Sequence, residues 1–211
     1  MLKLFYYPGN ASLAPHLILE EIGAPYELTL IDRTKAAHKS AEYLRLNPTG
    51  RIPTLIDGDL VVFETAAIAL HILDKYPRSG LAPAVGTPER AIFYQWIIHL
   101  TNTLQTEFRP YFYPHEHTDE ASAVAGVKAK AEARLDTMFD LIERHLEAGP
   151  YLLGATVSAA DLYLLMLIRW SRGMRRPARE LRNLKRLADL LLARPAVRRC
   201  LDQEGIGAPF I

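Results

Sequence analysis

The residues Tyr6 to His16, YYPGNASLAPH, lie where a strand-like segment gives way to a helix-like one. The apolar run before Pro8-Gly9 favours a strand, and the pattern after Ser12 favours a helix. Many enzymes hold a reactive group at such a turn. The candidate catalytic side chains here are Ser12, Asn10 and Tyr6. Ser12 could instead act only as a helix N-cap, and Tyr6 could simply pack in the core.

The stretch FETAAI, Phe63 to Ile68, could receive the head group of an amino acid. Thr65 is a plausible N-cap of the following helix, where free N–H groups and the helix dipole favour an anion. A carboxylate could bind the amide and hydroxyl of Thr65 while Glu64 pairs with an ammonium group. Plain helix capping is the alternative, and it is the simpler interpretation of these residues alone.

Two further features could contribute to binding. Pro53 opens the strand-like run IPTLI, and a cis Ile52–Pro53 bond would turn the preceding backbone groups outward, ready to pair with an extended peptide. Spacing alone favours the commoner trans form. His38 and Lys39 precede a short helix and could hold a carboxylate, although solvated charge is the ordinary state of such residues.

Three segments together resemble the glutathione transferase family. They are HKSAEYLRLNPTGRIPTL, FETAAIALHIL and YLLGATVSAADLYL, and their order and spacing extend the resemblance over nearly the whole chain. The resemblance implies that glutathione is a cosubstrate and that no cofactor is bound. It also implies that the Ile52–Pro53 bond is cis and that the neighbouring backbone pairs with the cysteinyl part of glutathione.

The resemblance implies one anion site for each end of this tripeptide. Glu64 and Thr65 match the residues that grip the γ-glutamyl end. The glycyl carboxylate would be held near His38, Lys39 and Arg51. The residues themselves suggest anion binding at Thr65 and at His38 and Lys39, and the resemblance adds Arg51.

The opening KLFYYPG-x-x-S-L-A-P-H resembles the bacterial beta class most closely, with one departure. A cysteine usually precedes the serine in that class, whereas this chain has Ala11, which can neither donate a hydrogen bond nor form a mixed disulfide. A donor near the sulfur would stabilise the thiolate of glutathione and lower its pKa. We rank the donors Ser12, Asn10, Tyr6. Tyr7 should point to the opposite face from Tyr6 because strand side chains alternate.

The elements that position these residues predict two domains. Strand-like and helix-like segments follow the order βαβαββα through residues 1–78, which is typical of an α/β thioredoxin-like domain. A Pro- and Gly-rich linker is expected at 79–88, and an all-α domain at 89–211.

The helical domain should contribute the electrophile pocket, expected between the two domains. Apolar and aromatic side chains suit such a pocket, although some of them must be ordinary helix packing. The candidates are Gln105, Phe108, Tyr111 and Phe112. Beta-class proteins often have a histidine near the position of Gln105, which is a second departure.

The sequence VSAAD predicts a capping box at the start of the apolar helix in this domain. Ser158 would be the N-cap, and Asp161 would reach back to the Ser158 amide. We therefore interpret Asp161 as a structural residue.

Composition limits the alternatives. The formal charge of +1 gives no general reason to expect nucleic acid, although residues 169–199 hold eleven basic and two acidic residues. The longest apolar run near the C-terminus is too short for a membrane span. The single cysteine, Cys200, suits a reducing cytoplasm. His115-Glu116-His117 lacks further ligands, so no metal site is expected.

The sequence thus predicts a cytoplasmic glutathione transferase, a homodimer as is usual in the family. It would conjugate glutathione to an apolar electrophile, with neither nucleic acid nor membrane as partner. Two alternatives remain open. Ala11 makes a non-catalytic binding or assembly module credible, and a glutathione-dependent peroxidase or disulfide reductase would use a different acceptor.

Overall fold

The computed structural model describes residues Met1–Ile211 and divides into two compact units. The first contains Met1–Ala84 together with Leu191–Phe210, and the second contains Val85–Leu190 and Ile211. The first is an α/β thioredoxin-like unit and the second is helical, which confirms the predicted fold class.

The first unit is built on a four-stranded mixed sheet. Its strands are β1 (Leu2–Tyr6), β2 (Tyr26–Leu30), β3 (Thr54–Asp57) and β4 (Leu60–Phe63), in the order β2-β1-β3-β4. Strand β2 runs parallel to β1 because a helix connects them, whereas β3 and β4 form an antiparallel hairpin. Gly58 has a φ of 62° in the hairpin turn, a conformation that favours glycine.

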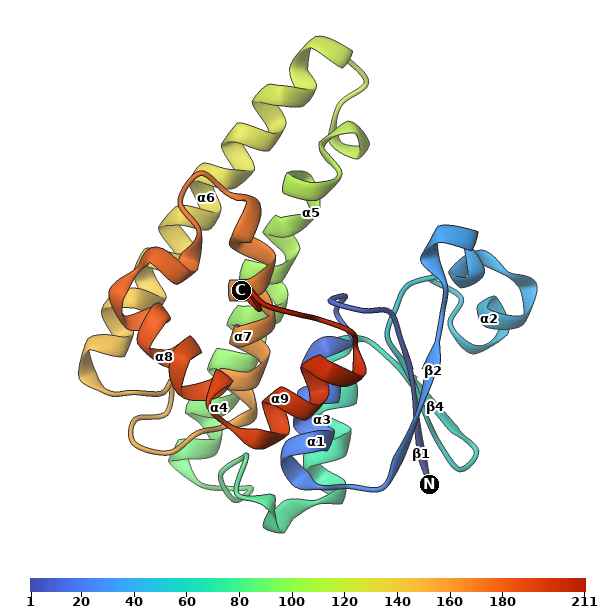
Figure 1. The fold of residues 1–211 in the computed structure, drawn as a ribbon, viewed down its shortest axis with the longest axis vertical. Coiled ribbons are helices and arrows are strands. Elements are labelled where there is room, and N and C mark those ends of the chain that lie inside the picture. Colours follow the sequence, from blue (N-terminus) through green and yellow to red (C-terminus); the bar gives the residue numbers. More distant parts are fainter. The chain divides into compact units, whose positions relative to one another are not determined.

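Helices cover both faces of this sheet (Figure 1). Helices α1 (Leu13–Ile22), α3 (Thr65–Lys75) and α9 (Pro195–Gln203) lie on one side, and the short α2 (Ala41–Leu46) lies on the other. The fully buried apolar residues that these elements contribute include Leu4, Leu17, Ile18, Leu55, Ile68 and Ile72.

Tyr6 at the end of β1 and Tyr7 directly after it point to opposite faces of the sheet. The ring of Tyr6 meets that of His16 on α1, with centroids 6.2 Å apart. The ring of Tyr7 packs against a separate cluster that includes Phe5, Tyr43 and Ile52. The two-residue period of a strand therefore holds here, as predicted.

The second unit consists of helices joined by short turns. They are α4 (Pro88–Ile98), α5 (Thr106–Phe112), α6 (Val124–His145), α7 (Ala159–Trp170) and α8 (Arg182–Leu192). A π-helical segment, His99–Gln105, joins α4 to α5. Helix α7 is buried from Ala159 to Ile168, as its apolar sequence predicts. None of the helices in the structure combines the length and apolar character needed to cross a membrane.

The predicted capping box at the start of α7 is present. The backbone N–H and hydroxyl of Ser158 both donate to Asp161 Oδ2, at 2.8 Å each. The Leu152 N–H donates to the other carboxylate oxygen at 2.7 Å. Burial raises the pKa of Asp161 to about 6 although these hydrogen bonds act to lower it. The Asp161 carboxylate thus accepts hydrogen bonds that stabilise the N-terminus of α7, which agrees with a structural role.

The C-terminal helix lies elsewhere than the sequence suggests. We expect residues 89–211 to form one helical domain, yet α9 belongs to the first unit and packs on α1. Val197, Cys200 and Leu201 form its buried side. An amphipathic pattern predicts that one side of a helix is buried. It does not predict which other element of the chain covers that side. The domain limits 1–78 and 89–211 themselves remain predictions.

Candidate functional site

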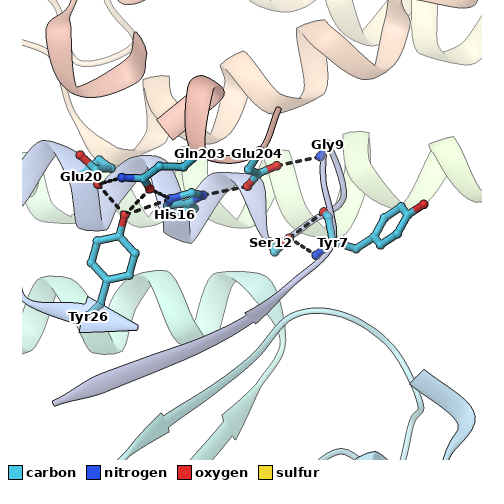
Figure 2. A network of polar contacts seen from close by, with 8 residues as sticks. All are labelled: Tyr7, Gly9, Ser12, His16, Glu20, Tyr26, Gln203 and Glu204. Atoms are coloured by element: carbon cyan, nitrogen blue, oxygen red, sulfur yellow. Dashed lines mark hydrogen bonds and ion pairs between the residues drawn. The ribbon is translucent and has the colours of Figure 1, made fainter. Parts of the chain in front are cut away.

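The turn after β1 is closed by Ser12. Its buried hydroxyl donates to the Tyr7 carbonyl at 3.2 Å and accepts from the Tyr7 N–H at 3.3 Å (Figure 2). Ser12 occupies the position before α1, but its side chain makes no hydrogen bond to a helix N–H. The hydroxyl therefore holds the turn together rather than capping the helix.

Asn10 is the half-buried polar residue of the same turn. Its Oδ1 accepts from the Ala11 N–H at 2.6 Å, and its backbone N–H donates to the Tyr7 carbonyl at 3.0 Å. These bonds fix the side chain and leave the two Nδ2 protons without a partner in the chain. A ligand anion next to this turn could accept one of them.

The turn is tied to the C-terminal end of α9 by Glu204. One carboxylate oxygen accepts from the Gly9 N–H at 2.7 Å, and the other lies 2.8 Å from His16 Nδ1 (Figure 2). The side chains of His16 and Glu204 are fully buried. A buried carboxylate needs such partners, so this pair fixes the turn relative to both α1 and α9.

The same network continues on the other side of the His16 ring. His16 Nε2 lies 2.7 Å from Gln203 Oε1, and the Gln203 amide donates to Glu20 at 2.9 Å. The Tyr26 hydroxyl donates to Glu20 at 2.5 Å, and burial together with Glu20 raises the pKa of that hydroxyl. Burial acts to raise the pKa of Glu20, but donors including Tyr26, Gln203 and Arg199 bring it below its ordinary value.

Tyr6 faces this network. Burial, with a smaller effect of the Glu204 charge, raises the pKa of the Tyr6 hydroxyl. Tyr6 therefore stays protonated and can donate but does not supply a phenolate near neutral pH.

The N-terminus of α3 has no side-chain cap. Glu64 is the N-cap residue and Thr65 is the first residue of the helix, so the predicted N-cap role of Thr65 is wrong by one position. Glu64 has a φ of 75°, a strained conformation for a residue with a side chain, and it makes no capping hydrogen bond. The buried Thr65 has no hydroxyl partner in the chain, so the ordinary capping explanation does not apply to either residue.

The Ile52–Pro53 peptide bond is cis, as the family resemblance implies. The backbone N–H and carbonyl of Ile52 make no hydrogen bond within the chain. The adjoining loop is held firmly, since the Arg51 carbonyl accepts from the Tyr43 hydroxyl at 2.7 Å and from Asn47 Nδ2 at 2.9 Å. A fixed loop with open backbone groups suits pairing with an extended peptide.

Strand register brings these three places together. Phe5 of β1 pairs with Thr54 of β3, and Thr54 also pairs with Phe63 of β4. The turn that follows β1, the Ile52–Pro53 bond that precedes β3 and the Glu64–Thr65 pair that follows β4 therefore meet at one end of the sheet. The sequence predicts each of these three segments as a candidate for binding. The strand pairing adds that all three lie at the same end of the sheet.

A group of cations lies around the loop before α2. Burial lowers the pKa of His38, and the charges of Arg33 and Lys39 lower it further. Lys39 Nζ lies so near Gly50 that a Cβ there would be only 2.8 Å away. Arg51 follows directly and is exposed. Lys39 and Arg51 could hold a carboxylate by charge, and His38, whose lowered pKa favours the neutral ring, could donate an N–H to it.

Arg33 is the residue that sequence reasoning missed. Its guanidinium lies 5.8 Å from the centre of the Tyr7 ring, which connects the cations to the turn after β1. Its place in an unremarkable loop sequence, DRTK, gives no signal of this contact.

The proposed electrophile residues belong to the second unit and differ in accessibility. Phe108 and Tyr111 are buried in an aromatic cluster with Phe112 and Trp170. Phe112 is 44% exposed. Gln105 Oε1 accepts from the Tyr163 hydroxyl, which leaves its amide nitrogen as a donor. Phe108 and Tyr111 thus serve first as core residues.

The basic stretch 169–199 finds many partners inside the chain. Arg175 and Arg176 pair with Glu132 and Asp140 of α6, and Arg186 donates to backbone carbonyls. Within the loop HEH, Glu116 pairs with Arg109. The local excess of arginine does not by itself require an external partner.

Comparison with known proteins identifies the class. The model for the glutathione S-transferase N-terminal domain matches residues 1–74, and the model for the C-terminal domain matches residues 119–199. The glutathione S-transferase GST-4.5 of Xanthomonas campestris pv. campestris is 32% identical over 205 residues, which is 97% of this chain and all of that protein. The chain belongs to the glutathione S-transferase family.

Solved structures agree with this assignment. A glutathione transferase from Methylococcus capsulatus is 32% identical, with a TM-score of 0.87 over 98% of this chain and 100% of that chain. A sphingomonad glutathione S-transferase complexed with glutathione is 31% identical, with a TM-score of 0.85 over 97% of this chain and 100% of that chain.

The first prediction concerns the anchor at Glu204. Glu204→Gln places a neutral amide in the buried network, so Gly9 and His16 both lose a charged acceptor and one of them faces an NH2 group instead. We expect a loss of about 1–3 kcal/mol in the free energy of unfolding, measured by urea titration. Glu42→Gln, which changes an exposed residue, is the matched control. An unfolding curve for Glu204→Gln that overlays the control would show that the anchor contributes little.

Proposed function

We propose that the chain binds glutathione at the shared sheet end of the first unit, with the γ-glutamyl group at the N-terminus of α3. The uncapped pair Glu64–Thr65 is the observation that supports this most. The Thr65 N–H and hydroxyl would donate to the α-carboxylate, and Glu64 would pair with the α-ammonium group. The strained φ of Glu64 fits a residue held for binding.

The same end of the sheet offers partners for the cysteinyl and glycyl residues of the tripeptide. The open backbone of Ile52 beside cis-Pro53 would pair with the cysteinyl residue, as an added strand pairs with a sheet edge. Lys39 and Arg51 would hold the glycyl carboxylate by charge, Arg33 extends this cationic group, and the neutral His38 ring would donate an N–H. Both ends of a dianionic peptide then have a partner, and the sulfur lies toward the turn after β1.

Asn10 is the best placed donor to the sulfur. Its Nδ2 has no partner in the chain, whereas the Ser12 hydroxyl is occupied on both sides by Tyr7. This reverses the order expected from the sequence. Tyr6 remains third, because its ring faces His16. A donor stabilises the thiolate and lowers its pKa, and the N-terminus of α1 acts in the same direction.

We propose that the activated thiolate attacks an apolar electrophile by substitution or conjugate addition. The sulfur lone pair forms the new bond to carbon, and a leaving group departs or the adjacent double bond takes up the electrons and a proton. Phe112 and Gln105 are the accessible candidates for contact with this second substrate. A cytoplasmic homodimer without a bound cofactor stays part of the proposal.

The other glutathione-dependent activities have less support. Disulfide reduction through an enzyme cysteine would need a thiol at the turn, where this chain has Ala11. The single cysteine, Cys200, is fully buried, and burial raises its pKa well above the ordinary value. A non-catalytic binding module keeps the same site and differs only in thiol activation.

The second prediction tests binding. Thr65→Ala removes a donor to the ligand carboxylate but no hydrogen bond within the chain. Calorimetry with glutathione should show affinity lowered about tenfold or more, the equivalent of about 1.5–3 kcal/mol, with unchanged thermal stability. Thr118→Ala in the second unit is the matched control and should bind as the wild type does. Equal affinities for all three proteins would remove the α3 site from the proposal.

The third prediction tests catalysis. Asn10→Ala should lower kcat/KM with a chloronitrobenzene by about tenfold to a hundredfold and raise the pKa of bound glutathione, read from thiolate absorbance. Ser12→Ala should mainly lower thermal stability, because its hydroxyl closes the turn. If Ser12→Ala shifts the thiol pKa and Asn10→Ala does not, Ser12 rather than Asn10 is the donor to the sulfur. Wild-type protein that binds glutathione with an unshifted thiol pKa and no turnover would be a binding module.

A further inference from the structure

A second cluster of reactive side chains lies between α1 and α9, within the first unit. His16 of α1 meets Cys200 near the end of α9 and Glu204 just after it, and all three are buried. Their ligating atoms lie within 4.8 Å of one another. Cys200 and Glu204 are four residues apart, so a helical turn presents both to the same side.

The types of these three side chains fit one kind of ion. Thiolate, imidazole and carboxylate are the ligands that Zn²⁺ binds, at about 2.3 Å to sulfur and about 2.0–2.2 Å to nitrogen and oxygen. Tetrahedral geometry then separates the ligand atoms by about 3.3–3.6 Å. His16 Nδ1 and Glu204 Oε1, now 2.8 Å apart, need to move apart by only about half an ångström, and all three ligand atoms already lie within 4.8 Å of one another.

The charges of the three side chains favour a divalent cation at this buried site. The cysteine thiolate and the Glu204 carboxylate carry two negative charges, and the imidazole is a neutral ligand. A divalent cation makes the set neutral, which avoids the large cost of burying net charge. The nearby carboxylate of Glu20 is already paired with Arg199 at 2.9 Å and adds no unbalanced charge.

The two ligands His16 and Glu204 also have the outer partners that metal ligands require. His16 Nε2 lies 2.7 Å from Gln203 Oε1, which fixes a proton on Nε2 and directs Nδ1 toward Glu204 (Figure 2). The second oxygen of Glu204 accepts from the Gly9 N–H at 2.7 Å. Such outer hydrogen bonds orient metal ligands and are part of most metal sites.

We propose that His16 Nδ1, Cys200 Sγ and Glu204 Oε1 form a Zn²⁺ site with three protein ligands, distinct from the glutathione site. Binding breaks the His16–Glu204 hydrogen bond, and the protons of Sγ and Nδ1 leave to solvent. Lone pairs of sulfur, nitrogen and oxygen form the three metal bonds, with one position left for water. The ion would lock α9 onto α1 and so stabilise the first unit. Sequence spacing predicts no such site, because His16 lies far along the chain from Cys200.

The experiment measures metal binding without glutathione. Chelator-treated protein is titrated with Zn²⁺ against a chromophoric chelator, and the zinc content is counted by mass spectrometry. We expect one Zn²⁺ per chain, a higher melting temperature with Zn²⁺, and a thiolate-to-metal absorption band when Co²⁺ replaces it. Cys200→Ser and Cys200→Ala should bind Zn²⁺ about tenfold or more weakly than the wild type. Neither variant should show the Co²⁺ thiolate band or a rise in melting temperature with Zn²⁺.

The matched control is the exposed histidine pair of the HEH loop. His115→Ala with His117→Ala removes the surface nitrogens that could bind Zn²⁺ and should leave the stoichiometry unchanged. Loss of binding in this variant, with binding retained in the Cys200 variants, would overturn the proposal. So would a wild-type protein with no stoichiometric zinc or no Co²⁺ thiolate band. None of these readouts depends on glutathione, so either proposal can fail without the other.

Discussion

The site depends on the hydrogen-bond register of β3, which pairs with β1 on one side and β4 on the other. Thr54 is paired with Phe5 and with Phe63, so the chain segments next to these residues must meet. A shift by one residue would turn the side chains of β3 to the wrong faces and separate the turn, the cis peptide and the start of α3. The three segments that we propose bind glutathione are brought together by this pairing.

A second constraint acts on the turn itself. Glu204, at the far end of the sequence, accepts from the Gly9 N–H and contacts His16, while Ser12 closes the turn from within. The fixed side chains leave Asn10 Nδ2 as the open donor. Ser12 and Glu204 therefore stabilise the turn, while Asn10 is the residue that we propose donates to the ligand. The Glu204 anchor also explains how α9 comes to belong to the α/β unit.

Much of this could be read from the sequence because its signals are local. Period-two alternation, Gly58 and the SAAD box gave the strands, the hairpin and the capped helix. The roles of Ser12 and Thr65 differ from expectation because each depends on a neighbour's backbone: Tyr7 engages the Ser12 hydroxyl, and Glu64 takes the N-cap position. Arg33 and the partner of α9 were missed, since contacts over long sequence separation leave no periodic pattern.

The most direct measurement is a crystal structure of the protein with glutathione. We expect the γ-glutamyl carboxylate at the N–H and hydroxyl of Thr65, the cysteinyl backbone paired with Ile52, and the sulfur within hydrogen-bond distance of Asn10 Nδ2. Density for the tripeptide at another surface, or an α3 N-terminus that stays free at saturating glutathione, would contradict this expectation.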